Sequence, residues 1–157
     1  MSCDDTLKVI KGCCGEPAIK AQVGIGYIYV PNVFTPNHDQ INDRFVIYGE
    51  NMKRVVSLRI RHQNGVLVYT GMDQAIPNHL MSWDGSFHGV VERGVYSYEL
   101  EVESVDGTRK SFKGQVCSFP CDQETDQDVI PLQGCEFGPP DTNFDPPYIP
   151  WEQLPCF

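Results

Sequence analysis

Strict alternation of apolar and polar residues is the feature that most constrains the fold of this 157-residue chain. In the clearest run, 94–103, two sets of residues alternate: Tyr96, Tyr98, Leu100 and Val102 on one side, and Val95, Ser97, Glu99, Glu101 and Glu103 on the other. A period of two places successive side chains on opposite faces of a strand. Segment 55–61 alternates in the same way, which predicts Val56, Leu58 and Ile60 on its buried face. Both segments are therefore expected to be strands with one buried face.

Turn signals that contain glycine separate these runs. Asn64-Gly65 and Asp106-Gly107 each follow a strand-like segment, and both residues of an Asn-Gly pair tolerate the positive φ of tight hairpins. No ten-residue stretch combines a helical apolar period with capping residues. We therefore predict an all-β fold, an immunoglobulin-like β-sandwich of about seven strands. The sandwich is expected at 25–119, between an N-terminal arm at 1–24 and an extended tail at 120–157.

The chain is acidic, with a formal net charge of −9 and a pI of about 4.7. Such a surface disfavours nucleic acid and anionic lipid headgroups as partners. No apolar run reaches the roughly 18 residues that a membrane-spanning helix needs. The sequence contains no Gly-x-Ser-x-Gly, phosphate-loop or His-Glu-x-x-His motif. Its four histidines are scattered in expected loops, so we expect no enzymatic activity: His38, His62, His79 and His88.

The segment 29–45 joins a strand, a proline-containing turn, a loop rich in Asn and Asp, and a second strand. It reads Tyr-Val-Pro-Asn-Val-Phe-Thr-Pro-Asn-His-Asp-Gln-Ile-Asn-Asp-Arg-Phe. This motif closely resembles the opening of the gliding-motility-associated C-terminal domain, also called the type B sorting domain of type IX secretion in Bacteroidota. Members of that family open with a pattern such as V-P-N-x-F-T-P-N-G-D-G-x-N-D-x-F.

Further blocks resemble the same family in the same order along the chain. They are Leu58-Arg59-Ile60 with the hairpin 64–69, the Trp83-Asp84-Gly85 turn that continues to Gly89, the strand start at 94–98, and Asp106-Gly107 with 112–116. The resemblance implies a surface-exposed β-sandwich that binds a barrel-type shuttle and the secretion machinery. Protein–protein contact, and not catalysis, is then its expected role.

The chain also departs from the family pattern in informative places. His38 and Gln40 stand where the family has glycines, and 62–64 replaces its N-R-W sequence. Family members end at or just after the last strand, whereas this chain continues for the whole of 120–157.

The cysteine content indicates an oxidising compartment, because cytosolic proteins rarely use so many cysteines. Seven are present: Cys3, Cys13, Cys14, Cys117, Cys121, Cys135 and Cys156. Cys3 is the candidate for lipidation, since Ser2-Cys3-Asp4-Asp5 resembles the end of a lipoprotein signal; the alternative is a free or disulfide-bonded thiol. The other six are disulfide candidates whose pairing stays open, and a zinc site that uses Cys117 and Cys121 is the rival interpretation.

The tail begins with acidic residues and then becomes rich in proline and aromatic residues. Proline favours extended conformations, and a disordered tail would be poor in aromatic residues. We therefore expect an extended arm that packs on this domain or on a partner. The partner-binding candidates are Phe144, Tyr148, Trp151 and Phe157.

The loop after Pro36 holds oxygen-bearing side chains at close spacing, namely Asn37, Asp39, Asn42 and Asp43. Calcium prefers such ligands, although Asx turns in the loop would explain the same residues. We expect no cofactor, and calcium bound at this loop is the alternative. Trp83 is expected in the core, and stacking on a sugar is the alternative. A solvated strand face is the simplest interpretation of Glu99, Glu101 and Glu103.

Together these features favour a non-enzymatic cell-envelope protein. The leading hypothesis is a small, lipid-anchored β-sandwich subunit that docks on a larger outer-membrane or type IX secretion complex, such as a barrel-type protein. It expects an outer-membrane or cell-surface location in a Gram-negative member of the Bacteroidota, no nucleic acid partner, and membrane contact only through the N-terminal lipid. The alternatives are a type IX sorting domain of an exported protein and a calcium-dependent carbohydrate-binding module.

Overall fold

The computed structural model describes residues 17–36, 43–74 and 78–118, with the backbone alone for 73, 74, 78 and 79. These residues form eleven strands and no helix. Accordingly, no helix in this part of the chain is long and apolar enough to cross a membrane. The expected all-β fold is confirmed.

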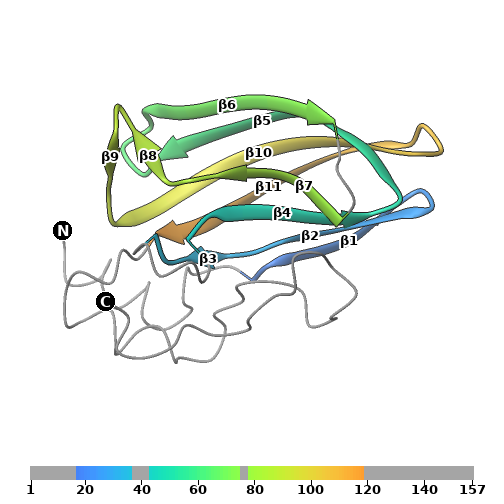
Figure 1. Ribbon diagram of the computed structural model, residues 1–157, viewed down its shortest axis with the longest axis horizontal. Coiled ribbons are helices and arrows are strands. Elements are labelled where there is room, and N and C mark those ends of the chain that lie inside the picture. The colour runs from blue at the N-terminus through green and yellow to red at the C-terminus, as the bar shows by residue number, and fades with distance from the viewer. Residues whose placement is uncertain (1–16, 37–42, 75–77, 119–157) are drawn as a thin grey trace.

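The strands form two packed sheets, drawn as two layers in Figure 1. Sheet A has the order β1 (Ile19–Val23), β2 (Gly26–Val30), β4 (Phe45–Glu50) and β7 (Asn78–Trp83). Sheet B has the order β3 (Val33–Phe34), β11 (Arg109–Ser118), β10 (Gly94–Ser104), β5 (Met52–His62) and β6 (Leu67–Gln74). A separate hairpin joins β8 (Ser86–Phe87) to β9 (Val90–Val91). Within the two sheets only the β3–β11 pair is parallel among the described strands.

The sandwich contains more strands than the sequence analysis expected. Nine strands belong to the two sheets, partly because β1 lies in the segment assigned to the N-terminal arm and because β3 is only two residues long. The arrangement confirms a β-sandwich, while its immunoglobulin-like detail stays a prediction.

The facing sides of the two sheets enclose one hydrophobic core. On β10 the predicted inward residues are all buried: Tyr96, Tyr98, Leu100 and Val102. On β5 the prediction for Val56 is wrong, because Val55 is buried in its place and Val56 is half-buried. The register of β5 against β6 shifts between Val55 and Leu58. Such a bulge inserts one residue and exchanges the two faces of the strand.

Aromatic rings fill the centre of the core. The Trp83 ring on β7 lies 5.0 Å from Tyr96, 5.8 Å from Phe34 and 6.2 Å from Tyr69, measured between centroids. Its Nε1 donates a hydrogen bond of 3.1 Å to the Ser86 carbonyl, so the polar atom of the buried indole is satisfied. Trp83 is therefore a core residue, as expected.

Three Asx-Gly turns share one geometry. In each, the side-chain Oδ1 accepts a hydrogen bond from the backbone N–H two residues later: Asn64 from Val66 (3.0 Å), Asp84 from Ser86 (2.9 Å) and Asp106 from Thr108 (2.9 Å). The glycines that follow these residues have φ of 90°, 84° and 90°. Glycine adopts this left-handed region without the penalty that a Cβ imposes. Of the Asn64-Gly65 pair, only the glycine has a positive φ.

Replacing Gly85 by alanine is expected to lower the free energy of unfolding by about 2 to 4 kcal/mol, because backbone strain and steric overlap add. Gly85 has a φ of +84°, and an added Cβ would lie 2.9 Å from the Phe34 ring. Gly89→Ala is the control, since its φ is +78° but no atom lies within 4 Å of the added Cβ. Urea denaturation of both variants measures the difference, and equal losses would contradict the overlap.

Candidate functional site

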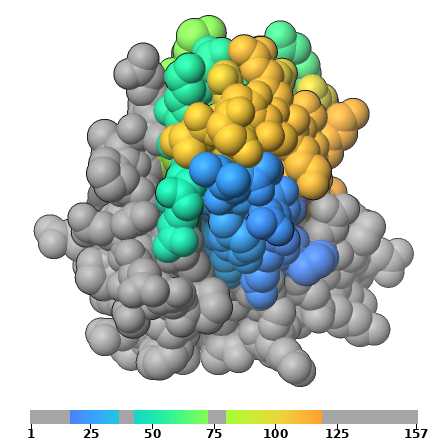
Figure 2. All heavy atoms as spheres, turned by 90° about the vertical axis from the view of Figure 1, so that its right-hand side faces the viewer, coloured from blue at the N-terminus to red at the C-terminus, as the bar shows by residue number. Residues whose placement is uncertain are grey.

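Three turns meet at one end of the sandwich. They are the β1–β2 turn at Gly24-Ile25, the β4–β5 connection at Asn51, and the β10–β11 turn that contains Asp106. The Ile25 N–H donates to Asp106 Oδ2 at 3.1 Å, and the Val105 N–H donates to the Asn51 carbonyl at 3.0 Å. Figure 2 shows this end, where the β1–β2 hairpin (blue) lies against the β10–β11 region (yellow to orange). The hydrogen bonds therefore join a turn of sheet A to a turn of sheet B.

Asp106 is the acceptor at the centre of this end. Its carboxylate accepts hydrogen bonds from the Ser104 hydroxyl, the Thr108 N–H and the Ile25 N–H. These bonds, led by that from Ser104, lower the pKa of Asp106 from 3.8 to about 2. Gly24 is required beside it, because an added Cβ would overlap the Asp106 carboxylate and Gly24 has a φ of +58°.

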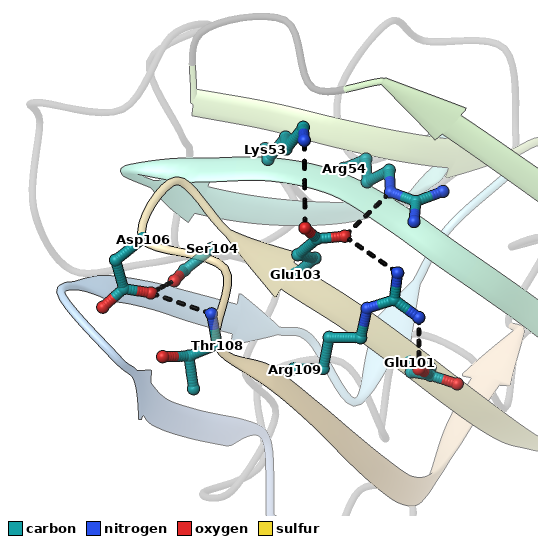
Figure 3. A network of polar contacts seen from close by, with 8 residues as sticks. All are labelled: Lys53, Arg54, Glu101, Glu103, Ser104, Asp106, Thr108 and Arg109. Carbon is teal, nitrogen blue, oxygen red and sulfur yellow. Dashed lines mark hydrogen bonds and ion pairs between the residues drawn. The ribbon is translucent and has the colours of Figure 1, made fainter.

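A second polar cluster surrounds Glu103 near the same end (Figure 3). Glu103 Oε1 lies 3.0 Å from Arg54 Nε and 3.4 Å from an Arg109 guanidinium nitrogen, and Oε2 lies 3.9 Å from Lys53 Nζ. The Arg54 hydrogen bond is the main cause that lowers the pKa of Glu103, and the charges of Arg109 and Lys53 add to it. Arg109 also reaches Glu101 at 3.9 Å. Glu103 is buried by these cations, so the expectation of a solvated face is wrong for this residue.

The outer face of sheet B is charged along its centre. Glu99 on β10 pairs in register with Arg59 on β5 and with Lys113 on β11, so the sign of charge alternates across the three strands. Two shallow hollows, of about 300 Å³ and 480 Å³, lie along this face. Both are lined by Arg59, Glu99 and Lys113, and Arg61 adds to one of them. A face of this kind can bind the charged side chains of a polypeptide.

Most of the site residues proposed from sequence lie outside the described residues. These are Cys3, Cys13, Cys14, Cys121, Cys135, Cys156, Asn37, Asp39, Asn42, Phe144, Tyr148, Trp151 and Phe157. Lipidation, calcium binding and partner contact at these positions therefore stay predictions.

Two of the proposed residues, Cys117 and Asp43, are described. Cys117 is buried and disulfide-bonded; its partner cysteine lies outside the described ranges, so the pairing stays open. Asp43 is half-buried. Within the described ranges no three His, Cys, Asp or Glu side chains converge as metal ligands would.

Sequence reasoning missed the Glu103 cluster, although one signal for it was available. Asp106-Gly107 fixes the β10–β11 turn, and counting outward from that turn pairs Glu103 with Arg109, as observed. No such count gives Arg54, which comes from a strand about fifty residues earlier.

The motif residues singled out in the sequence meet in the core. Phe34 packs on Phe45 and on Trp83, at centroid distances of 6.3 Å and 5.8 Å, and Phe45 packs on Tyr98 at 5.6 Å. The blocks that are far apart in the sequence thus define one packing arrangement.

Comparison with known proteins finds one family whose sequence model matches most of the described residues. Residues 28–117 match the sequence model of the family described as CHU_C Type IX secretion signal domain. No curated protein matches the chain. A solved structure that resembles it is the crystal structure of CopC from Methylosinus trichosporium OB3b, with 16% identity and a TM-score of 0.44. That alignment covers 68% of this chain and 97% of CopC.

The low pKa of Asp106 predicts how stability depends on pH. A carboxyl group whose pKa is lower in the folded state stabilises the fold above its unfolded pKa of 3.8, and this stabilisation is lost as the pH falls through about 2. The urea midpoint of the unaltered protein should therefore fall more steeply on acidification over this range than that of Asp106→Asn. Glu99→Gln, which neutralises an exposed carboxylate on β10, is the control and should keep the steep fall. Parallel curves of the urea midpoint against pH for Asp106→Asn and the unaltered protein would show that Asp106 does not cause the steep fall.

Proposed function

Because the chain belongs to the CHU_C type IX secretion signal domain family, we propose that it is a non-enzymatic export signal recognised by the type IX secretion machinery. The observation that carries the proposal is the match over residues 28–117, which includes β3 to β10 and all of β11 except its last residue, Ser118. Family membership implies a cell-envelope or secreted protein of the Bacteroidota.

The machinery would have to recognise side chains on the folded surface, and not the buried residues of the motif blocks. Phe34, Trp83 and Tyr98 belong to the motif blocks, and all three side chains are buried in the core. A receptor cannot contact them while the sandwich is folded. These buried motif residues therefore specify the fold, and recognition is left to the side chains that the fold exposes, among them Arg59 and Lys113 of the same motif blocks.

The outer face of sheet B is the recognition surface that we favour. Arg59, Glu99 and Lys113 are exposed there on adjacent strands, and the strand register fixes their spacing. Complementary charges across an interface contribute chiefly to specificity and to the association rate. A fixed row of alternating charges supplies such a pattern on a chain whose formal net charge is −9.

Export of a reporter tests this proposal. A periplasmic reporter joined to the N-terminal side of the full chain should reach the cell surface in a strain with type IX secretion, and should stay inside a strain that lacks it. Neutralising the charged row with Arg59→Ser and Lys113→Ser should reduce surface delivery on the order of tenfold, because two charged contacts are lost.

The control variant carries Arg59→Lys and Lys113→Arg, which keep the positive charge at both positions. This variant should be exported normally. The thermal midpoints of both double variants should stay close to that of the unaltered chain, because the side chains are exposed. Delivery that does not depend on the type IX machinery would overturn the export function. Normal delivery of the serine variant would instead exclude only this face.

We propose a second function, which the composition of the tail favours: a lipid-anchored subunit that docks on a larger outer-membrane or gliding-related complex. In this function Cys3 carries the lipid, and Phe144, Tyr148, Trp151 and Phe157 contact the partner. Aromatic residues on a proline-rich chain lose little conformational entropy on binding, which suits them to this role.

Deleting residues 136–157 should then abolish co-purification with the complex and leave the sandwich folded. Native-membrane pull-downs with the full and the shortened chain provide the measurement, and circular dichroism checks the fold. An unchanged set of co-purifying proteins would reject the docking function.

A further inference from the structure

Sheet A carries apolar side chains on both of its faces. On β2, Ile28 and Val30 lie in the core, so Tyr29 between them lies on the outer face, away from sheet B. On β4 the same alternation places Tyr48 outward, next to the core residue Ile47. Tyr29 and Tyr48 pair in register, and their rings are 6.4 Å apart in an edge-to-face contact.

These outward tyrosines are nevertheless buried. Tyr29 is 2% exposed and Tyr48 is 6% exposed, and with Ala18 and Val46 they form a cluster separate from the main core. Sheet B packs on the inner face of sheet A. None of the described strands lies over the outer face. The exposed fractions are those of one copy of the chain. The described strands therefore do not account for the burial of the two rings.

We propose that the C-terminal segment 144–157 lies across the outer face of sheet A and packs its aromatic side chains against Tyr29 and Tyr48. This inference goes beyond the proposed export function and does not depend on it, and it is an alternative to the docking function, which assigns the same aromatic side chains to a partner. We name the outer face around Tyr29, Tyr48, Ala18 and Val46 the tyrosine face.

Composition favours this segment over the N-terminal arm. Segment 144–157 contributes six large apolar or aromatic side chains: Phe144, Tyr148, Ile149, Trp151, Leu154 and Phe157. Residues 1–16 contain no aromatic side chain, and their larger aliphatic residues, Leu7, Val9 and Ile10, stand next to lysines. Edge-to-face and stacked ring contacts stabilise aromatic pairs beyond the area that they bury. An aromatic face is therefore best matched by the aromatic segment.

Chain length and charge are consistent with the same placement. About 25 residues separate the end of β11 from Phe144, and an extended chain of that length spans about 80 Å, more than twice the length of the longest strands. Lys20 stands on the tyrosine face, with its Nζ 5.8 Å from the centre of the Tyr29 ring. Asp145 and Glu152 in the segment supply the opposite charge.

Nitration of tyrosines by tetranitromethane, read by peptide mass spectrometry, tests the proposal on the full chain. In the unaltered protein Tyr29 and Tyr48 should react slowly. In the variant Phe144→Ser, Tyr148→Ser, Trp151→Ser both should react on the order of tenfold faster, which corresponds to about 1.4 kcal/mol less cost of exposing the rings. Tyr27 is 37% exposed and should react in both proteins. Tyr98, in the core, should react in neither.

A spectrophotometric titration provides a second measurement. Burial raises the pKa of Tyr48 to about 12. If the segment covers the ring, this pKa should fall towards the model-compound value of 10.0 in the triple variant. An unchanged pKa together with unchanged nitration would overturn the proposal.

The N-terminal arm is the alternative cover for Tyr29 and Tyr48. A matched variant of the arm distinguishes it from segment 144–157. Leu7→Ser, Val9→Ser, Ile10→Ser should leave Tyr29 and Tyr48 protected. Exposure of the two rings in this variant, and not in the tail variant, would overturn the assignment to 144–157. If Tyr98 also reacts in the triple variant, the sandwich has unfolded, and the single substitution Trp151→Ser is judged by the same criteria.

Discussion

The Trp83 ring holds the two sheets in their relative position. It extends from β7 of sheet A and contacts Tyr96, Tyr69 and Phe34, which all belong to strands of sheet B. Burial of so large a ring is favourable only if the neighbouring side chains fit closely around it. The turn after Trp83 is constrained in consequence, because Gly85 must leave room for the Phe34 ring. The packed indole therefore determines the position of β7, the path of the turn that follows it and the position of the short strand β3.

Much of the fold was predictable because the recognisable residues are those that pack. The alternation on β10 and the blocks around Phe34 and Trp83 mark buried positions, and burial imposes a pattern on a sequence. The bulge on β5 was not predictable, since Val55 and Val56 are equally apolar and only the register decides between them. The polar clusters were largely unpredictable from the sequence for a related reason. Arg54 and Glu103 meet across strands distant in sequence, so their contact follows from topology and not from spacing.

The two outer faces of the sandwich differ in chemistry, and this difference suggests a division of roles. Sheet B presents an exposed row of alternating charges on β5, β10 and β11. Sheet A presents paired tyrosines that are buried although they point away from the core. A charged, hydrated face suits contacts that form and separate, whereas an apolar face is stable only when it is covered. The charged face is therefore the better candidate for transient recognition, and the tyrosine face for a permanent layer of the domain.

The Asx-Gly turns have a consequence for the chemical lifetime of the protein. Asn-Gly and Asp-Gly sequences age by cyclisation, in which the glycine amide nitrogen attacks the preceding side-chain carbonyl carbon and forms a succinimide. Here the Gly65 N–H already donates to the His62 carbonyl at 2.8 Å, and the Gly107 N–H donates to Ser104 at 3.0 Å. The side chains of Asn64 and Asp106 are held by their own hydrogen bonds. The same bonds that shape these hairpins therefore restrain the two groups from reacting, which should slow deamidation at Asn64 and isomerisation at Asp106.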